Sequence, residues 1–428
     1  MRFAPKPEND FACFIRTYYR ECRERFEKIE AIAGKWMFRD LVPGLSDFDA
    51  RLTVSNRMTA DDWCRMSTAV GQTHLALCRK YPAWTRNLEH LPGINLTWDE
   101  LLEERAYYPE YQQWSFYDCQ DPGQISAVVD RLGRRGLDAK DEHFHLKRFC
   151  TYFGRYDRAI DPPINLGVHA NKYALHSRLM HYFTPPVHSA MFLLEKRPFV
   201  GKFEALEVAS QRFAELKCWD YAWEILAADY MTPKWYEEPY LSELEDALED
   251  GLAAIRDALR DVITLVPREP GADVAAWRRA LSEFPADPAS VIFEGAKFSR
   301  LMKGRLQFYA DAPQHFDAAW LIRNELGRIG QGFFVIPFRT YWRAATGRSV
   351  DDPIEILPEL RGTLLSHEEA GAVEQFHRLT SEPCVLGREK QSARAVAGVF
   401  DGFFHALWKI SREVVSREPV PTQRTPAP

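Results

Sequence analysis

The stretch that decides the fold is Gly34-Lys-Trp-Met-Phe-Arg-Asp-Leu-Val-Pro-Gly-Leu-Ser-Asp-Phe-Asp-Ala-Arg-Leu-Thr-Val54. Residues 35–42 have the composition of a strand, and residues 43–46 (Pro-Gly-Leu-Ser) are typical of a turn. Residues 47–54 alternate apolar and polar side chains, which predicts a half-buried strand with one polar face. We therefore expect two strands that pair in one sheet.

Two carboxylates lie close together on the second of these strands. Asp47 and Asp49 are two residues apart, so both project from one face, with Cα atoms roughly 6.5–7 Å apart. Carboxylates at that distance repel each other unless a cation lies between them. Mg²⁺ suits the pair because it prefers hard oxygen ligands from one or two carboxylates and from substrate phosphates. Two such ions hold the attacking and leaving oxygens of a phosphoryl displacement, so the spacing predicts a site for one or two Mg²⁺ ions.

Helices and further strands are expected around this stretch. They are a helix over residues 10–32, a helix from Thr59 or Asp61 to about Lys80, and strands over residues 94–98 and 114–118. Together they predict a small sheet-containing domain, and helical spacing of apolar residues dominates the rest of the chain. The fold class expected is α+β.

The expected domain boundaries follow from composition and breaks in the pattern. They are a sheet domain over 1–125, a helical substrate-binding domain over 126–350, a C-terminal helical subdomain over 351–417 and a disordered tail over 418–428. Proline-rich breaks near residues 267–288 and 353–358 are the best internal boundaries.

The arrangement resembles the DNA polymerase β-like nucleotidyltransferase superfamily. Members have a helix, a strand ending in Gly-Ser, a loop of about a dozen residues and then Ser-Asp-x-Asp on the next strand. Here Ser46-Asp47-Phe48-Asp49 matches the second part residue for residue. The resemblance covers about residues 10–120 and is clearest with small-molecule nucleotidyltransferases, such as those that adenylylate aminoglycosides. It implies a small mixed sheet with helices on one face, often followed by a helical substrate domain.

The resemblance also implies roles for individual residues. Asp47 and Asp49 would hold Mg²⁺, and Ser46 would meet the triphosphate of an NTP. The family's Gly-Ser at the end of the first strand is missing, and Lys35 and Arg39 occupy that region. Either cation would hold the triphosphate instead.

The family usually adds a third carboxylate on a later strand. Asn95 stands where that acid is expected. Asp99, four residues on, shares the predicted strand face with Asn95, and Asp118 is the other candidate. Either would help to hold metal or take the acceptor's proton. The sequence leaves this choice open.

A second stretch, from Tyr152 to Arg178, is dense in polar and aromatic residues. Arg155, Lys172 and Arg178 would supply positive charge to nucleotide phosphates. His176 lies four residues after Lys172, which places both on one face if this segment is helical. The alternative is a surface loop that leads into a core helix, with His176 as a packing residue.

Composition limits the classes of partner and compartment. The chain has 428 residues and a formal net charge of −6, which argues against a dedicated nucleic-acid binder because no positive surplus neutralises phosphates. Its eight cysteines have no C-x-x-C spacing, which indicates a reducing compartment. No secretory segment is visible, and no apolar run reaches the roughly 20 residues of a membrane span. We expect a cytoplasmic protein without membrane association, and the oligomeric state stays open.

Two functions remain at this point. The first is a Mg²⁺-dependent nucleotidyltransferase that moves a nucleoside monophosphate from an NTP to a small-molecule acceptor with release of pyrophosphate. The second is a non-catalytic scaffold of the same fold that binds a nucleotide or a protein. The missing Gly-Ser and Asn95 favour the scaffold, whereas the retained pair of carboxylates favours the enzyme.

Overall fold

The computed structural model describes residues 9–34, 48–85, 87–103, 108–133, 136–153, 179, 183–199, 201–231, 242–269, 272–285, 287–312 and 318–417. The chain divides into two compact units. Unit 1 takes in the described residues of Met1–Ser55, Ala76–Glu103 and Tyr107–Pro285. Unit 2 takes in those of Asn56–Leu75 and Ala286–Pro428.

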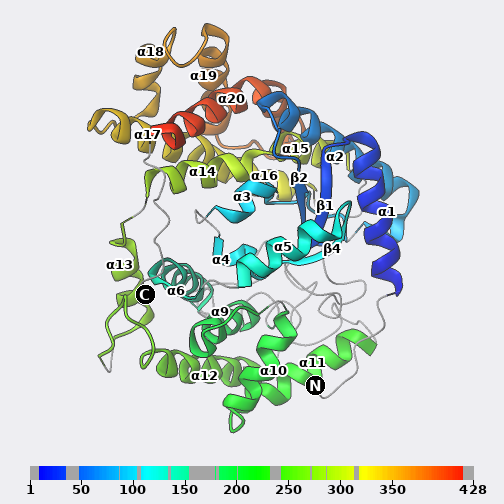
Figure 1. The fold of residues 1–428 in the computed structure, drawn as a ribbon, viewed down its shortest axis with the longest axis vertical. Coiled ribbons are helices and arrows are strands. Elements are labelled where there is room, and N and C mark those ends of the chain that lie inside the picture. Colours follow the sequence, from blue (N-terminus) through cyan, green and yellow to red (C-terminus); the bar gives the residue numbers. More distant parts are fainter. Residues whose placement is uncertain are drawn as a thin grey trace. The chain divides into compact units, whose positions relative to one another are not determined.

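The protein is α+β, as the sequence predicts, with a small mixed sheet in unit 1 and a mainly helical remainder. The strands are β1 (Ile29–Gly34), β2 (Ala50–Val54), β3 (Asn95–Thr97) and β4 (Ser115–Cys119). Their order in the sheet is β3-β2-β1-β4. Strand β1 pairs antiparallel with β2 and with β4, whereas β2 and β3 are parallel. Figure 1 shows β1 and β2 beside helix α1 (blue).

Helix α1 (Asn9–Arg25) forms because apolar side chains recur on one face. The buried residues of that face are Phe11, Phe14, Ile15, Tyr18 and Cys22. The prediction that this helix continues to residue 32 is wrong, because β1 begins at Ile29. Ala31 and Ile32 are adjacent in β1, so they lie on opposite faces, and both are fully buried; both strand faces are therefore apolar there. A short apolar run of this kind fits a helix or an inner strand equally well by periodicity.

Strand β1 ends at a glycine for a steric reason. A Cβ atom on Gly34 would approach the Tyr117 ring and its hydroxyl oxygen more closely than real Cβ atoms approach other atoms. The ring of Tyr117 therefore occupies the space beside the end of β1. The strand predicted over residues 35–42 lies outside the described residues.

Strand β2 confirms the predicted strand over Ala50–Val54, whereas Phe48 and Asp49, which the prediction included, precede it. Of the predicted polar face, Asp49 is exposed, but the part within the strand is not. Arg51 and Thr53 belong to that face, and both are buried. The reason is that the polar face is covered and its charge is compensated, since Arg51 pairs with Glu110 of helix α4 (Tyr108–Tyr111). Strands β3 and β4 confirm the predictions at 94–98 and 114–118.

Helix α2 (Ala60–Lys80) confirms the helix expected from Thr59 or Asp61 to Lys80. Thr59 and Asp62 cap its first turn reciprocally. The Asp62 N–H donates to the Thr59 hydroxyl at 3.1 Å, and the Thr59 N–H donates to the Asp62 carboxylate at 2.9 Å.

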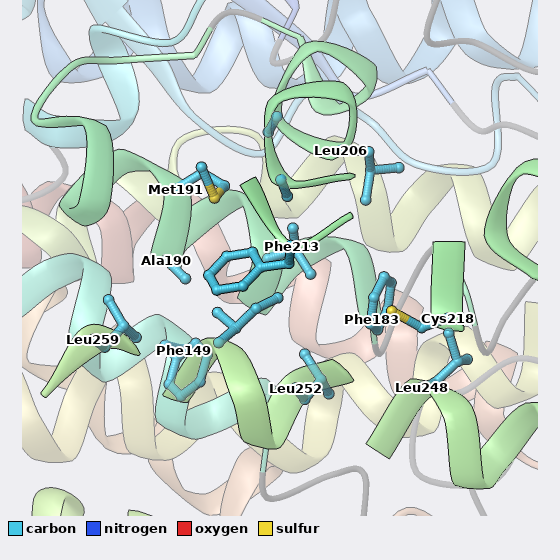
Figure 2. Close-up of a cluster of buried hydrophobic side chains, with 14 of the residues drawn as sticks. Phe149, Phe183, Ala190, Met191, Leu206, Phe213, Cys218, Leu248, Leu252 and Leu259 are labelled. Atoms are coloured by element: carbon cyan, nitrogen blue, oxygen red, sulfur yellow. The ribbon is translucent and has the colours of Figure 1, made fainter. Parts of the chain in front are cut away.

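The other elements of unit 1 in its described part are helical, and those from residue 139 onward surround a core of their own. The helices are α3 (Trp98–Leu102), α4, α5 (Pro122–Gly133), α6 (Ala139–Phe153), α9 (Thr184–Glu195), α10 (Lys202–Arg212), α11 (Cys218–Met231), α12 (Ser242–Leu259) and α13 (Val274–Ser282), with a 3₁₀ turn at Pro82–Trp84. Figure 2 shows part of this core, in which Phe149, Phe183 and Leu252 are among the buried side chains from α6 through α13. The contiguous apolar cluster explains why these helices pack as one body.

The regular elements in the described part of unit 2 are helices, connected by loops that include an isolated β-bridge between Arg361 and Leu365. Unit 2 contains α2 up to Leu75, α14 (Pro288–Ser299), α15 (Met302–Asp311), α16 (Ala318–Ile329), a π-helical segment at Gly330–Val335, α17 (Ile336–Thr346), a 3₁₀ turn at Pro353–Ile356, α18 (Leu357–Leu360), α19 (His367–Ser381) and α20 (Glu389–Arg417). In chain order, the last division between the two units lies between Pro285 and Ala286. The domain boundaries expected at residues 125, 350 and 417 stay predictions from the sequence.

Candidate functional site

Asp49 is the acidic residue of the Ser-Asp-x-Asp match that the structure describes, and its backbone is tightly held. It lies directly before β2, between Phe48 and Ala50. The Phe48 N–H donates to the Asn87 carbonyl at 3.1 Å, and the Ala50 N–H donates to the Phe48 carbonyl at 2.7 Å. The second bond spans two residues, which is the pattern of a γ-turn centred on Asp49.

Packing fixes the neighbouring residue as well. Phe48 is buried, and its ring contacts three aromatic rings on α1 and β4. They are Phe14 at 5.3 Å, Tyr18 at 6.2 Å and Tyr117 at 5.8 Å between ring centroids. Aromatic contacts of this kind anchor the chain on the α1 side. The side chain of Asp49 is 46% exposed, so the site offers a solvent-facing carboxylate on a fixed backbone.

Arg51 holds the same segment from the other face. Its Nη1 donates to the Ala50 carbonyl at 3.0 Å and to the Asp49 carbonyl at 3.3 Å. Its Nη2 donates to Oε1 of Glu110 at 3.0 Å in a buried ion pair. The distance from Nη1 to Oδ1 of Asp49 is 3.9 Å, so the Asp49 carboxylate lies on the Arg51 side of the strand.

Asp49, with Arg51 beside it and Glu110 beside Arg51, is suited to supply one carboxylate ligand of a Mg²⁺ site. The Asp49 oxygens are hard donors, and the neighbouring positive charge of Arg51 is balanced by Glu110. Within the residues that the structure describes, no group of three or more His, Cys, Asp or Glu side chains is placed to hold a metal ion. Asp47, the second expected ligand, lies outside those residues.

Asn95 has a structural role at the position where a third acid is expected. Its Oδ1 accepts a hydrogen bond from the Leu52 N–H at 3.2 Å, and its Nδ2 donates to the Pro92 carbonyl at 3.0 Å. The residue is fully buried. The amide therefore satisfies a donor on β2 and an acceptor before β3 at the same time, which a carboxylate does not do.

Asp99 does not share a strand face with Asn95, contrary to the prediction. Strand β3 ends at Thr97, and Asp99 lies in the first turn of α3, exposed to solvent. The reason is a capping box, in which the Thr97 hydroxyl accepts from the Glu100 N–H and the Glu100 carboxylate accepts from the Thr97 N–H. The acidic residues that follow the strand favour the start of a helix there.

Asp118, the other candidate, lies on β4 next to helix α1. Its register partner is Ile32, and its Oδ1 accepts from the following N–H, that of Cys119. Burial raises the pKa of Tyr19 on α1. The charge of Arg23 lowers that pKa, whereas the nearby Asp118 carboxylate raises it further. Asp118 is thus close to the face of the sheet that α1 covers.

Asp118 and Arg51, beside which the Asp49 carboxylate lies, belong to opposite faces of the sheet. Successive residues of a strand point to opposite faces, and directly paired residues share a face. Arg51 is paired with Ala33, whereas Asp118 is paired with the preceding residue, Ile32. Since the Asp49 carboxylate lies on the Arg51 side, this placement disfavours Asp118 as its partner in one metal site.

The remaining predicted site residues lie outside the described part of the chain. They are Lys35, Arg39, Ser46, Asp47, Arg155, Lys172, His176 and Arg178. Their roles stay predictions from the sequence.

The Arg51–Glu110 pair is the feature of the site that the sequence does not indicate. The alternation of residues 47–54 places Arg51 on a solvent-facing side, and Glu110 is 59 residues away. The one signal in the sequence is the position of Arg51, two residues after Asp49 on the same predicted face, where a cation has a carboxylate within reach.

Comparisons of the chain with protein-family models, with curated proteins and with solved structures find no match. None of the helices in the described ranges combines the length and the apolar character that crossing a membrane requires.

Proposed function

We propose that this protein is a Mg²⁺-dependent nucleotidyltransferase that transfers a nucleoside monophosphate from an NTP to a small-molecule acceptor and releases pyrophosphate. The observation that carries the proposal is the exposure of the Asp49 carboxylate together with the fixed position of its backbone. This second aspartate of the Ser-Asp-x-Asp match presents an exposed carboxylate on a backbone that hydrogen bonds hold from both sides. A fixed, solvent-facing carboxylate is what a metal and triphosphate site requires.

The arrangement of the first two strands supports the same function. Strand β1 ends at Gly34, and Ser46 begins the Ser-Asp-x-Asp match, which leaves about a dozen residues between them. This order of helix, strand with a terminal glycine, loop and Ser-Asp-x-Asp is similar to that of the DNA polymerase β-like nucleotidyltransferases. The similarity is closer with a strand that ends at Gly34 than with one at residues 35–42, which leaves room for only a tight turn.

Each residue would have a separate role in binding or catalysis. Asp47 and Asp49 would hold Mg²⁺, and Ser46 with Lys35 or Arg39 would bind the triphosphate. The bound ion would neutralise charge on the phosphates during displacement. Asp99, exposed after β3, would take the proton of the acceptor. The helical region would bind the acceptor, and the cysteine pattern supports a cytoplasmic location.

One observation favours the alternative of a non-catalytic scaffold. The side chain of Asn95 is engaged with two backbone groups where the family usually has an acid. A scaffold would bind a nucleotide without metal dependence and without turnover.

The test is pyrophosphate release with each of the four NTPs and a panel of hydroxyl, amino, carboxyl and phosphonate acceptors. It is run beside melting curves with and without Mg²⁺–NTP. The variants are Asp47→Asn and Asp49→Asn, and Asp351→Asn at an exposed aspartate is the matched control. We expect the parent and the control to melt at a higher temperature with Mg²⁺–NTP, and both site variants to lose that shift.

The expected fall in rate for both site variants is about a hundredfold or more, because positioning and electrostatics supply most of the catalysis in this chemistry. Metal-independent nucleotide binding without pyrophosphate release from the parent would establish the scaffold instead. Parent-like rates and melting shifts in both site variants would rule out the metal site.

A further inference from the structure

We propose that the buried Arg51–Glu110 pair is a positioning device that fixes the Asp49 carboxylate for metal binding. The inference rests on the proposed function, since it assigns a role to two residues around the same site. Arg51 and Glu110 are 59 residues apart in sequence, yet their side chains are nearly inaccessible to solvent and lie 3.0 Å apart. A buried ion pair beside an exposed carboxylate calls for a reason beyond stability, because such pairs contribute little to stability by themselves.

The hydrogen bonds of Arg51 show what it holds. The side chain folds back along its own strand, and Nη1 donates to the carbonyls of Ala50 and Asp49. Glu110 holds the guanidinium in place through Nη2. The planar guanidinium donates in several fixed directions at once, so it ties both peptide groups after Asp49 to helix α4.

The opposite side of Asp49 is held by different groups. The Phe48 N–H is bonded to Asn87, the Ala50 N–H closes the γ-turn, and the Phe48 ring is packed against α1. The Cα atom of Asp49 is therefore fixed before any ligand arrives, while its carboxylate stays in solvent. A ligand group that is already in position loses less conformational entropy when it binds, and groups behind metal ligands raise metal affinity for this reason.

Arg51 has a second effect that opposes the first. Its positive charge lies 3.9 Å from the Asp49 carboxylate, and a cation at that distance competes with a divalent metal. Glu110 neutralises that charge. Positioning is the role that the geometry favours, because the contacts with the two carbonyls and with Glu110 are within hydrogen-bond distance and the contact with the carboxylate is not.

The two roles predict opposite results when the pair is removed. The test variant is Arg51→Met with Glu110→Leu, which replaces both partners with apolar side chains and leaves no unpaired buried charge. The measurement is Mn²⁺ binding followed by electron paramagnetic resonance, with a melting curve of each protein. We expect the dissociation constant for Mn²⁺ to rise about tenfold or more while the protein stays folded. Unchanged or tighter binding would overturn the positioning role, and tighter binding would identify Arg51 as a competing cation.

A single variant keeps the test decisive if the double variant does not fold. Arg51→Lys keeps the charge but loses the planar fork, so we expect weaker Mn²⁺ binding although the positive charge is unchanged. Parent-like binding by Arg51→Lys would contradict positioning. The matched control is Arg305→Met with Glu325→Leu, which removes a comparably buried ion pair in unit 2 together with the contact of Glu325 with the exposed Arg328, and it is expected to leave Mn²⁺ affinity as in the parent.

Asp49→Asn separates failure of this inference from failure of the proposed function. If Asp49→Asn binds Mn²⁺ like the parent, the metal site itself is wrong and Arg51 has nothing to position. If Asp49→Asn loses binding and the Arg51 variants keep it, the metal site stands and only the positioning role is overturned.

Discussion

The side-chain oxygen of Asn95 accepts a hydrogen bond from the backbone N–H of Leu52, 3.2 Å away, and so ties the parallel strands β2 and β3 together through a side chain. The same amide donates to the Pro92 carbonyl. An amide is suited to this place because it carries a donor and an acceptor at fixed positions. An asparagine at position 95 therefore stabilises the pairing of β2 and β3 through its side-chain hydrogen bonds.

Asn95→Asp tests that reason, since it supplies the acid expected at this position. The protonated carboxyl reproduces both hydrogen bonds, whereas the ionised form is buried and cannot donate to Pro92. Burial then raises the pKa of the introduced carboxyl above its unfolded value, so stability is near that of the parent at low pH and falls as pH rises. A pKa that is tenfold less acidic in the folded state corresponds to a loss of about 1.4 kcal/mol in the free energy of unfolding at neutral pH.

The measurement for Asn95→Asp is the free energy of urea unfolding between about pH 4 and pH 8. Asn56→Asp, at an exposed asparagine, is the control and should show no such slope. We expect no gain in pyrophosphate release from Asn95→Asp. A pH-independent variant with higher activity would contradict the structural role of Asn95.

Arg300→Lys is expected to destabilise unit 2 although it conserves the charge. The Arg300 guanidinium is buried and lies 4.1 Å from the ring centroid of Trp63 and 5.8 Å from that of Trp408. An ammonium group does not stack on two indoles, so the loss is about 1–2 kcal/mol. Thermal unfolding followed by tryptophan fluorescence measures it. Arg348→Lys removes an exposed stacking partner of Trp342 and should change stability by less than about 0.5 kcal/mol.

Two glycine-to-alanine variants in helices are expected to change stability in opposite directions. A Cβ on Gly71 of α2 would lie 2.7 Å from the backbone oxygen of Gly304 on α15, so Gly71→Ala pushes the two helices apart and costs about 1–3 kcal/mol. A Cβ on Gly371 of α19 meets nothing within 4 Å. Gly371→Ala should therefore stabilise by about 0.5–1 kcal/mol through helix propensity. The melting temperatures of both variants are compared with that of the parent. Shifts in the same direction would contradict the close contact between α2 and α15.

Glu369 should make the stability of α19 depend on acid pH. Burial pushes its pKa up, but hydrogen bonds from Lys409 and from the Ser366 N–H outweigh this, and the pKa lies below its ordinary 4.5. For an acid with a lowered folded-state pKa, the stabilisation is present above the unfolded value and is lost as pH falls through the folded value.

Glu369→Gln should accordingly lower stability by about 1 kcal/mol at neutral pH, and the difference from the parent should disappear in strong acid. Urea unfolding at several pH values measures this. Glu368→Gln, at the exposed neighbour in the same helical turn, is the control and should change stability by less than about 0.5 kcal/mol. A constant difference at all pH values would show that the carboxylate charge of Glu369 has no role.

Local signals predict the elements whose ends are marked by side-chain chemistry. Thr59 precedes a long apolar periodicity, and α2 begins directly after it. Alternation around Leu96 predicts β3 well. Capping and alternation are set by neighbours in sequence, so they can be inferred without knowledge of the tertiary structure.

Features that depend on distant residues could not be predicted in this way. Ile29 and Ile32 form an inner strand only because β4 pairs with β1 from the far side. Arg51 is buried because Glu110 arrives from α4. Similarly, the basic residues at 297–305 have the charge density of a solvated helix face, whereas Lys297 and Arg300 are buried. In each case the surroundings that decide burial come from far away in sequence.

The order of strands in the sheet has a consequence for the sequence of events during synthesis. Strand β1 (Ile29–Gly34) is an inner strand, but one of its two neighbours, β4 (Ser115–Cys119), is made much later in synthesis. Until the ribosome has released β4, one edge of this apolar strand presents unpaired peptide groups to water or to a chaperone. A truncated chain that stops before Ser115 would therefore carry an open, aggregation-prone edge along the strand that leads to the Ser-Asp-x-Asp stretch.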